Sequence, residues 1–162
     1  PSFPTRRSSD LEIEKRQANK YHEFRSTNFM IEREVFVACP FDERFTRSGY
    51  EDVLFGKMLK QQQVPVTHID NPVMMTEFES NPDYVTKIER SMRTLYTFRQ
   101  ELKGYSRILT FDGGIHISAI RSLIRLWHRV FGNMERRNLC GPSPILKLFS
   151  LYRLGYYLTI KE

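Results

Sequence analysis

Several features that identify common classes of protein are scarce in this sequence. It has only two cysteines, Cys39 and Cys140, and neither has a partner at the spacing of a metal site. This excludes a disulfide-rich scaffold and favours two reduced thiols in a reducing compartment. No apolar run approaches the roughly 20 residues that span a bilayer. The sequence also contains no D-x-D triplet and no glycine-rich loop of the kind that cradles phosphate.

What is present fits a globular domain with a hydrophobic core, because 40% of the residues are hydrophobic and 27% are charged. The net charge of +6 is concentrated in residues 115–162, where eight Lys and Arg face two Glu. A basic region of this kind attracts phosphate, an anionic membrane surface or nucleic acid through the same electrostatics. No nucleic-acid-binding motif accompanies the charge, so nucleic acid is the least favoured partner.

Residues 1–11 are rich in Pro, Ser and Arg and share no periodicity with the rest of the chain. This composition predicts disorder, and we interpret the segment as a non-native leader translated from a cloning or sequencing adaptor. On that interpretation, the leader is fused to a reading frame that has lost its first part. Residues 12–105 then form one domain portion, and residues 106–162 form a basic helical extension.

The periodicity of the apolar residues predicts both strands and helices. Strands are expected at 24–31 and at 64–69, where β-branched residues are frequent. Asn81 is the expected N-cap of the clearest helix, and residues 112–114 are expected to form a turn. The expected helices are 33–39, 51–63, 81–104, 115–134 and 145–157.

The adjacent acids Glu51 and Asp52 have two interpretations. The run from Ser48 to Glu51 matches a capping box, in which the two side chains satisfy backbone N–H groups at the start of a helix. A carboxylate in the first turn also gains roughly 0.3–1 kcal/mol from the helix dipole. In the alternative interpretation, Asp52 stays ionised near neutral pH and accepts a proton from a hydroxyl group that attacks a substrate.

Three further segments accompany the acidic pair in a fixed order. Thr27–Ile31 precedes it, Phe41–Phe45 lies just before Ser48–Gly56, and His68–Val73 follows. Taken together, these motifs resemble the second half of a bacterial family 2 glycosyltransferase of the GT-A type. The resemblance covers about residues 25–102, which is roughly half of the chain.

The resemblance implies a fold and a set of site residues. The fold would be α/β, a partial GT-A domain of the nucleotide-diphospho-sugar transferase type, followed by amphipathic helices. Asp52 would be the catalytic base of an inverting single displacement, and Glu51, Asn28 and Gly49 would contact the acceptor. A divalent cation, Mg or Mn, is expected in the complete enzyme. Its ligands would lie mostly in the other half of the domain, because Met74–Thr76 stand where many members carry a histidine.

The implied function is that of a fragment of an inverting glycosyltransferase in cell-surface polysaccharide synthesis. It would transfer a sugar from a nucleotide-sugar donor to a glycan or lipid-linked acceptor. The fragment itself would be inactive without a donor-binding half. The expected location is the cytoplasm, either free or peripheral to the inner membrane.

A second class of function remains open. The segment 117–131 has an apolar face and an arginine-rich face, with Trp127 and Phe131 on the apolar side. Such a helix either packs on the domain or rests on anionic lipid. The alternative prediction is therefore a non-catalytic, basic, α-rich module that binds an anionic membrane surface or a partner protein.

Overall fold

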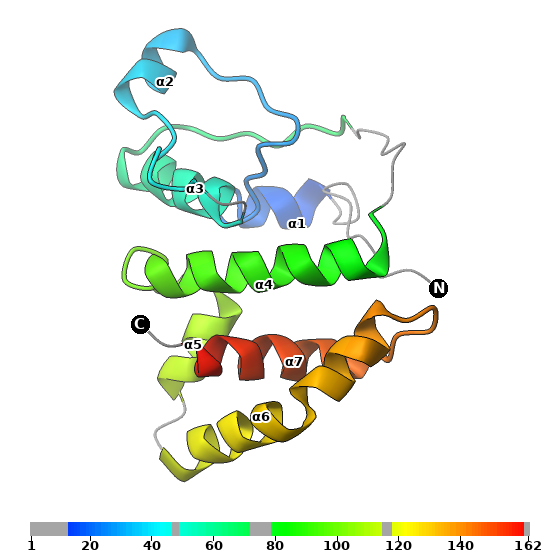
Figure 1. Ribbon diagram of the computed structural model, residues 1–162. Helices are drawn as coiled ribbons and strands as arrows, with labels where there is room; N and C mark the ends of the chain where they lie inside the picture. The colour runs from blue at the N-terminus through cyan, green and yellow to red at the C-terminus, as the bar shows by residue number, and fades with distance from the viewer. Residues whose placement is uncertain (1–12, 47–48, 72–78, 115–117, 161–162) are drawn as a thin grey trace. The chain divides into compact units, whose positions relative to one another are not determined.

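The computed structural model describes residues 13–46, 49–71, 79–114 and 118–160 (Figure 1). Within these ranges the chain forms seven helices and no strand. The described residues fall into two compact units. One contains α1 to α3 and the other contains α4 to α7.

The first unit carries α1 (Ile13–Ala18), α2 (Arg33–Ala38) and α3 (Glu51–Gln61). The predictions of helices at 33–39 and 51–63 are therefore confirmed, with α3 ending two residues earlier than expected. The inner side of α3 buries Leu54, Phe55, Gly56 and Leu59. These positions follow the helical period, which is why the sequence pattern located this helix correctly.

Phe55 is the centre of the aromatic core of this unit. Its ring stacks on Phe41 with a centroid separation of 4.1 Å and lies 5.2 Å from the ring of Phe24. Cys39 and Leu59 are buried against the same cluster. Offset aromatic pairs of this kind contribute roughly 0.5–1.5 kcal/mol beyond the area that they bury.

Gly56 sets how closely α3 approaches the preceding chain. A Cβ atom at this position would overlap the carbonyl oxygen of Tyr21 and would lie 3.1 Å from the Cβ of Phe24. Only a glycine allows the backbone of α3 to come this close. The approach holds the segment that carries Phe24 and Arg25 against the N-terminal half of α3.

The expectation of an α/β fold, and with it of a partial GT-A domain, is wrong. The described residues form an all-helical structure, and a GT-A remnant would require a β-sheet core. The segments 24–31 and 64–69 were both expected to be strands. Residues 24–28 include turns, and residues 64–71 have no regular secondary structure and belong to no ladder.

Side chains, and not a neighbouring strand, form hydrogen bonds to the backbone of residues 64–71. Tyr21 donates its hydroxyl to the Val64 carbonyl at 2.9 Å, and Arg16 donates to the Ile69 carbonyl at 3.0 Å. The backbone N–H of His68 donates to the Gln17 amide oxygen at 2.8 Å. Because backbone polar groups need partners, these contacts hold the segment in place without a sheet. The β-branched residues did not predict this segment correctly, because a strand also needs a neighbouring strand to pair with.

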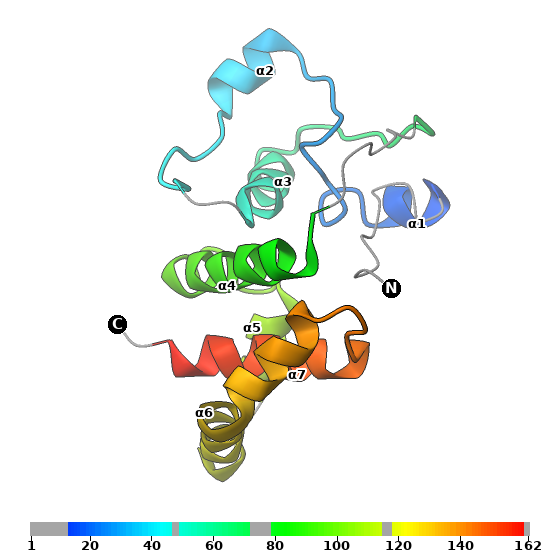
Figure 2. The same cartoon turned by 45° about the vertical axis from the view of Figure 1, so that its right-hand side comes forward.

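The second unit carries α4 (Asn81–Thr97), α5 (Arg107–Gly114), α6 (Ser118–Cys140) and α7 (Leu146–Thr159). Helices α4, α6 and α7 contact one another (Figure 2). Their shared core contains Val85 from α4, Leu139 from α6 and Tyr152 from α7, all of them buried. The two long helices expected from periodicity at 81–104 and 115–134 are thus present, with different ends.

The start of α4 differs from the sequence prediction by one residue. Ser80 is the N-cap, and its hydroxyl accepts a hydrogen bond from the Asp83 backbone N–H at 3.3 Å. Asn81 instead donates its side-chain amide to the Gly141 carbonyl at 2.7 Å. The expected turn at 112–114 is also wrong, because these residues complete α5. Among the helices of the described residues, none is long and apolar enough to cross a membrane.

Candidate functional site

Asp52 lies in the first turn of α3, as the sequence predicted. The N-cap is Tyr50, which has a left-handed φ of +72° and makes no side-chain cap. Gly49 before it has a φ of +114°, so two consecutive residues occupy conformations that L side chains rarely adopt. Ser48, the expected capping residue, lies outside the described residues. The capping box of Ser48 and Glu51 is therefore only partly within the described residues, but the Asp52 carboxylate does accept a hydrogen bond from the Val53 backbone N–H in the first turn.

The electrostatic environment of Asp52 is dominated by burial. Burial raises the pKa of the Asp52 carboxyl above its ordinary value, and the neighbouring Glu51 acts in the same direction. Arg25 and a 2.8 Å hydrogen bond from the Val53 backbone N–H to Oδ1 act in the opposite direction. The net pKa shift is upward, whereas a carboxylate that serves only to start a helix is expected to have a lowered pKa. A raised pKa makes the carboxylate a stronger base near neutral pH.

Arg25 is a site residue that the sequence pattern did not reveal. It lies close enough to Asp52 to lower the pKa of that carboxyl. Its guanidinium donates to the carbonyl of Phe24 at 2.7 Å and forms an ion pair with Glu23 at 3.4 Å. These local contacts orient the side chain. No spacing rule connects residue 25 with residue 52, because the close packing around Gly56 is what brings them together.

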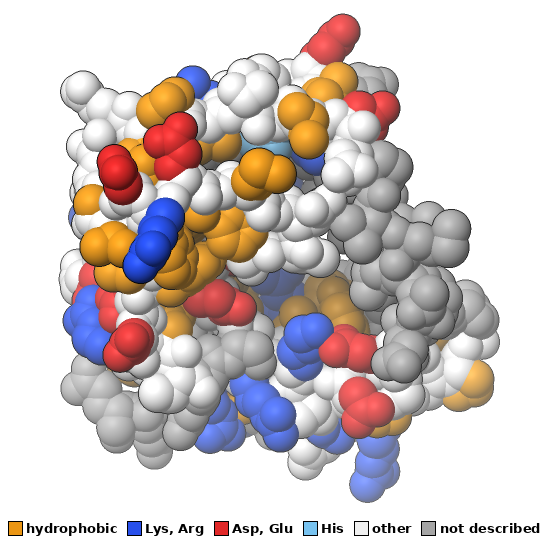
Figure 3. Space-filling view, turned by 90° about the horizontal axis from the view of Figure 1, so that it is seen from above, with side chains coloured by type: hydrophobic (Ala, Val, Ile, Leu, Met, Phe, Trp, Pro, Cys, Tyr) orange, Lys and Arg blue, Asp and Glu red, His pale blue; other side chains and the backbone are white. Residues whose placement is uncertain are grey.

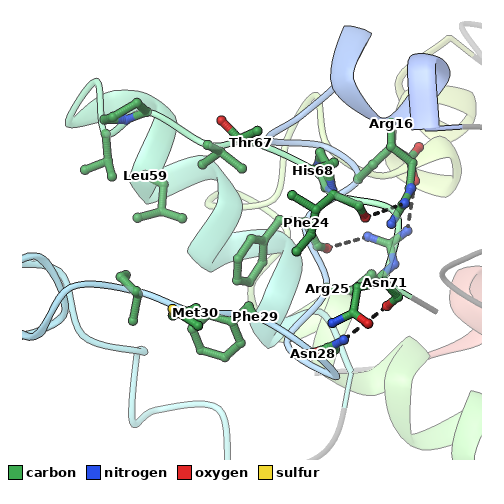
Figure 4. A pocket seen from close by; sticks show the side chains of 16 residues that line it. Arg16, Phe24, Arg25, Asn28, Phe29, Met30, Leu59, Thr67, His68 and Asn71 are labelled. Carbon is green, nitrogen blue, oxygen red and sulfur yellow. Dashed lines mark hydrogen bonds and ion pairs between the residues drawn. The ribbon is translucent and has the colours of Figure 1, made fainter. Parts of the chain in front are cut away.

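A cavity of about 410 Å³ lies in the same unit, between the segments 23–31 and 64–71 (Figure 4). Arg16, Arg25, Asn28 and Asn71 gather at one end of it, whereas apolar side chains line the other part. A pocket of this size with a few converging polar groups is typical of a small-molecule site. Its apolar lining includes Phe24, Phe29, Leu59 and Val66.

Asn28 was predicted to contact an acceptor, and the structure places it in the wall of this cavity. Its side-chain amide donates to the Asn71 carbonyl at 3.2 Å, which leaves the amide oxygen as an acceptor at the cavity edge. His68 is held by contact of its Nε2 with the Lys20 carbonyl at 2.9 Å. Its role in the cavity is therefore to fix the wall.

The cavity opens beside exposed hydrophobic side chains. Met30 is 99% exposed, and Ile69 and Phe29 are also exposed. Figure 3 shows hydrophobic side chains among acidic and basic ones on the face of the molecule seen from above. An apolar rim around polar groups suits a ligand that presents both apolar and hydroxylated surfaces.

The predicted site residues are only partly brought together. Asn28 lines the cavity, but Glu51, Asp52 and Gly49 do not. Arg25 connects the two parts, since it lines the cavity and influences the Asp52 carboxyl. The site therefore consists of a cavity and a half-buried carboxylate, and the Arg25 guanidinium group is common to both.

A divalent cation is implied by the resemblance described above. In the ranges that the structure describes, no three His, Cys, Asp or Glu side chains are grouped so that they could hold a metal ion. The divalent cation therefore stays a prediction, because its ligands were expected mostly in the other half of the domain.

Comparison of the chain with protein-family models, with curated proteins and with solved structures finds no match. The functional interpretation therefore depends on the residues of the site and on the ordered motifs.

The raised pKa predicts how the Asp52→Asn substitution changes stability with pH. A carboxyl group whose pKa is higher in the folded than in the unfolded state destabilises the fold once it is ionised. The variant is therefore expected to be more stable than the wild type at pH 7, and the difference should disappear near pH 3.5. Urea unfolding at both pH values measures this. A variant less stable than the wild type at pH 7 would show that the carboxylate supports the fold instead.

Proposed function

We propose that this chain is the acceptor-side part of an inverting glycosyltransferase of family 2. It would act in cell-surface polysaccharide synthesis, with a nucleotide sugar as donor and a glycan or lipid-linked glycan as acceptor. The observation that carries the proposal is the half-buried Asp52 carboxyl at the start of α3, within electrostatic reach of Arg25. The helical architecture lends the proposal no support, so it rests on this site and on the ordered motifs.

The proposed chemistry needs one base and one leaving group. The acceptor hydroxyl oxygen attacks the anomeric carbon of the donor sugar and forms the new C–O bond. The bond between that carbon and the nucleotide phosphate breaks, and the nucleotide leaves with the electron pair. Asp52 takes the proton of the attacking hydroxyl, which a partly desolvated carboxylate does well because its pKa is raised.

The cavity that Asn28 lines would hold the acceptor saccharide. The amide of Asn28 and the guanidinium groups of Arg16 and Arg25 offer hydrogen bonds to hydroxyl groups. Phe24 and Phe29 provide apolar surface for the C–H face of a sugar ring. Arg25 would then touch the acceptor and tune the base with the same side chain.

Saccharide binding tests the acceptor half of this proposal. The chain is expected to bind cell-surface oligosaccharides in saturation-transfer NMR, and Asn28→Ala should weaken binding about fivefold through the loss of one or two hydrogen bonds. Asn19→Ala is the matched control, because Asn19 is also exposed and donates to a backbone carbonyl, but lies outside the cavity wall. Equal effects of the two substitutions, or no binding at millimolar saccharide, would contradict the assignment.

The Asp52→Asn substitution tests the proposed role of Asp52 as the catalytic base. The variant should bind the saccharide as the wild type does, because the base is not needed for binding. The wild-type and variant sequences would each be fused to a donor-binding domain with which the wild-type sequence transfers sugar. In that fusion, the substitution should lower the transfer rate roughly 10²–10⁴-fold. Retained transfer would eliminate Asp52 as the base.

A second candidate function rests on a different observation, the apolar stripe on α6. Leu123, Trp127, Val130 and Met134 recur every three or four residues and are all exposed, at 42–66% of their surface. The opposite side of the helix buries Gly132, Glu135 and Leu139. An exposed apolar stripe beside arginine residues is the pattern of a helix that lies on an anionic membrane surface.

The single tryptophan reports on this second function. Trp127 fluorescence should shift to shorter wavelength when vesicles with anionic lipid are added, and the chain should sediment with them. Leu123→Glu should abolish both effects, whereas Ser122→Glu adds the same charge at an exposed position beside the stripe and should weaken them only slightly. Equal and negligible sedimentation with anionic and neutral vesicles would remove this function.

A further inference from the structure

The second unit contains a separate, strongly basic cavity of about 300 Å³ between α4, α6 and α7. Its wall includes three guanidinium groups and one carboxylate, which leaves two positive charges in excess. None of these residues belongs to the glycosyltransferase-like motifs, although Arg129 lies on the arginine-rich face of the segment 117–131. The sequence pattern did not reveal the cavity, because its arginines come from two helices far apart in the chain.

One of the three arginines is neutralised within the cavity wall. Arg136 donates its Nε to the Glu89 carboxylate at 2.7 Å, and Tyr152 donates its hydroxyl to the same oxygen at 2.6 Å. This network joins all three helices. It also keeps the Glu89 carboxylate hydrogen-bonded, so the only carboxylate among the residues that line the cavity already has partners.

The other two arginines, Arg93 and Arg129, keep guanidinium N–H groups available as hydrogen-bond donors. Arg93 donates its Nε to the Tyr156 hydroxyl at 3.0 Å, which fixes the direction of its guanidinium group. No other acceptor for Arg93 is found among the described residues. Arg129 is exposed and has no hydrogen-bond or ion-pair partner in the part of the chain that the structure describes. Glu89 also attracts Arg93 electrostatically, but that carboxylate is already bonded to Arg136 and Tyr152.

The inner wall of the cavity is built tightly. Gly132 and Gly155 leave room for the His128 ring, since a Cβ at Gly132 would lie 3.1 Å from it. His128 Nδ1 lies 3.5 Å from the Glu135 carboxylate, and both are almost fully buried. Burial lowers the pKa of His128, although Glu135 opposes this effect. The wall behind the arginines is thus closely packed around the His128 ring.

We propose that this cavity binds a phosphate or diphosphate group between Arg93 and Arg129. The planar guanidinium groups match phosphate oxygens in pairs, and the cavity supplies the positive charge that such a ligand needs. The phosphate can come from a soluble phosphate compound or from a lipid headgroup. The site does not depend on the proposed function of Asp52, which lies in the other unit.

Titration of the whole chain with inorganic pyrophosphate, followed by calorimetry, tests this site. Arg129→Gln is expected to weaken binding about tenfold, because it removes charge-assisted hydrogen bonds. The control is Arg137→Gln, which removes the same charge from an exposed position on the same helix outside the cavity wall. It should change the affinity less than twofold. Failure to bind pyrophosphate, or equal losses in the two variants, would overturn the proposal.

Vesicles distinguish the two sources of phosphate. The test uses phosphatidylcholine vesicles with and without phosphatidic acid, whose headgroup is a phosphate monoester. If a lipid headgroup occupies the site, pyrophosphate should displace the chain from the acidic vesicles and Arg129→Gln should release it. If the ligand is a soluble phosphate compound, Arg129→Gln should still weaken the binding of pyrophosphate. The same substitution should then leave sedimentation with either kind of vesicle unchanged.

Discussion

The close approach of α3 to the chain at Tyr21 is the constraint on which the first unit depends. It requires Gly56, because a side chain there would overlap the Tyr21 carbonyl. The approach places Phe24 against Phe55 and brings Arg25 near Asp52. The same contact therefore builds the aromatic core and sets the charge environment of the proposed base. Core packing and the electrostatic environment of Asp52 therefore both depend on Gly56.

The absence of a sheet among the described residues changes how the candidate site is held together. The segment 64–71 is fixed by side chains of α1 and of the turn that follows it, through Arg16, Gln17 and Tyr21. Side-chain hydrogen bonds are fewer per residue than those of a ladder, and they can be lost one at a time. This part of the cavity wall is therefore held by a few side-chain hydrogen bonds, two of which are exposed to solvent.

The sequence predicted the parts of the structure that depend on local rules. The helical period located α3, α4, α6 and α7, because each buries one side of the helix. The expected strands failed, because β-branched residues favour an extended chain but cannot supply a neighbouring strand. For the site, the position of Asp52 at a helix start was predictable. Its raised pKa and its relation to Arg25 were not, because both arise from contacts between residues far apart in the chain.

The most direct test of the account is the titration of the Asp52 carboxyl by ¹³C NMR. The two interpretations of the acidic pair predict opposite shifts. A buried base next to Arg25 should titrate above the ordinary aspartate pKa of about 3.9, and Arg25→Gln should raise the midpoint further. A residue that serves only to start α3 should titrate below that value. A midpoint at or below 3.9 would contradict the assignment of Asp52 as the base.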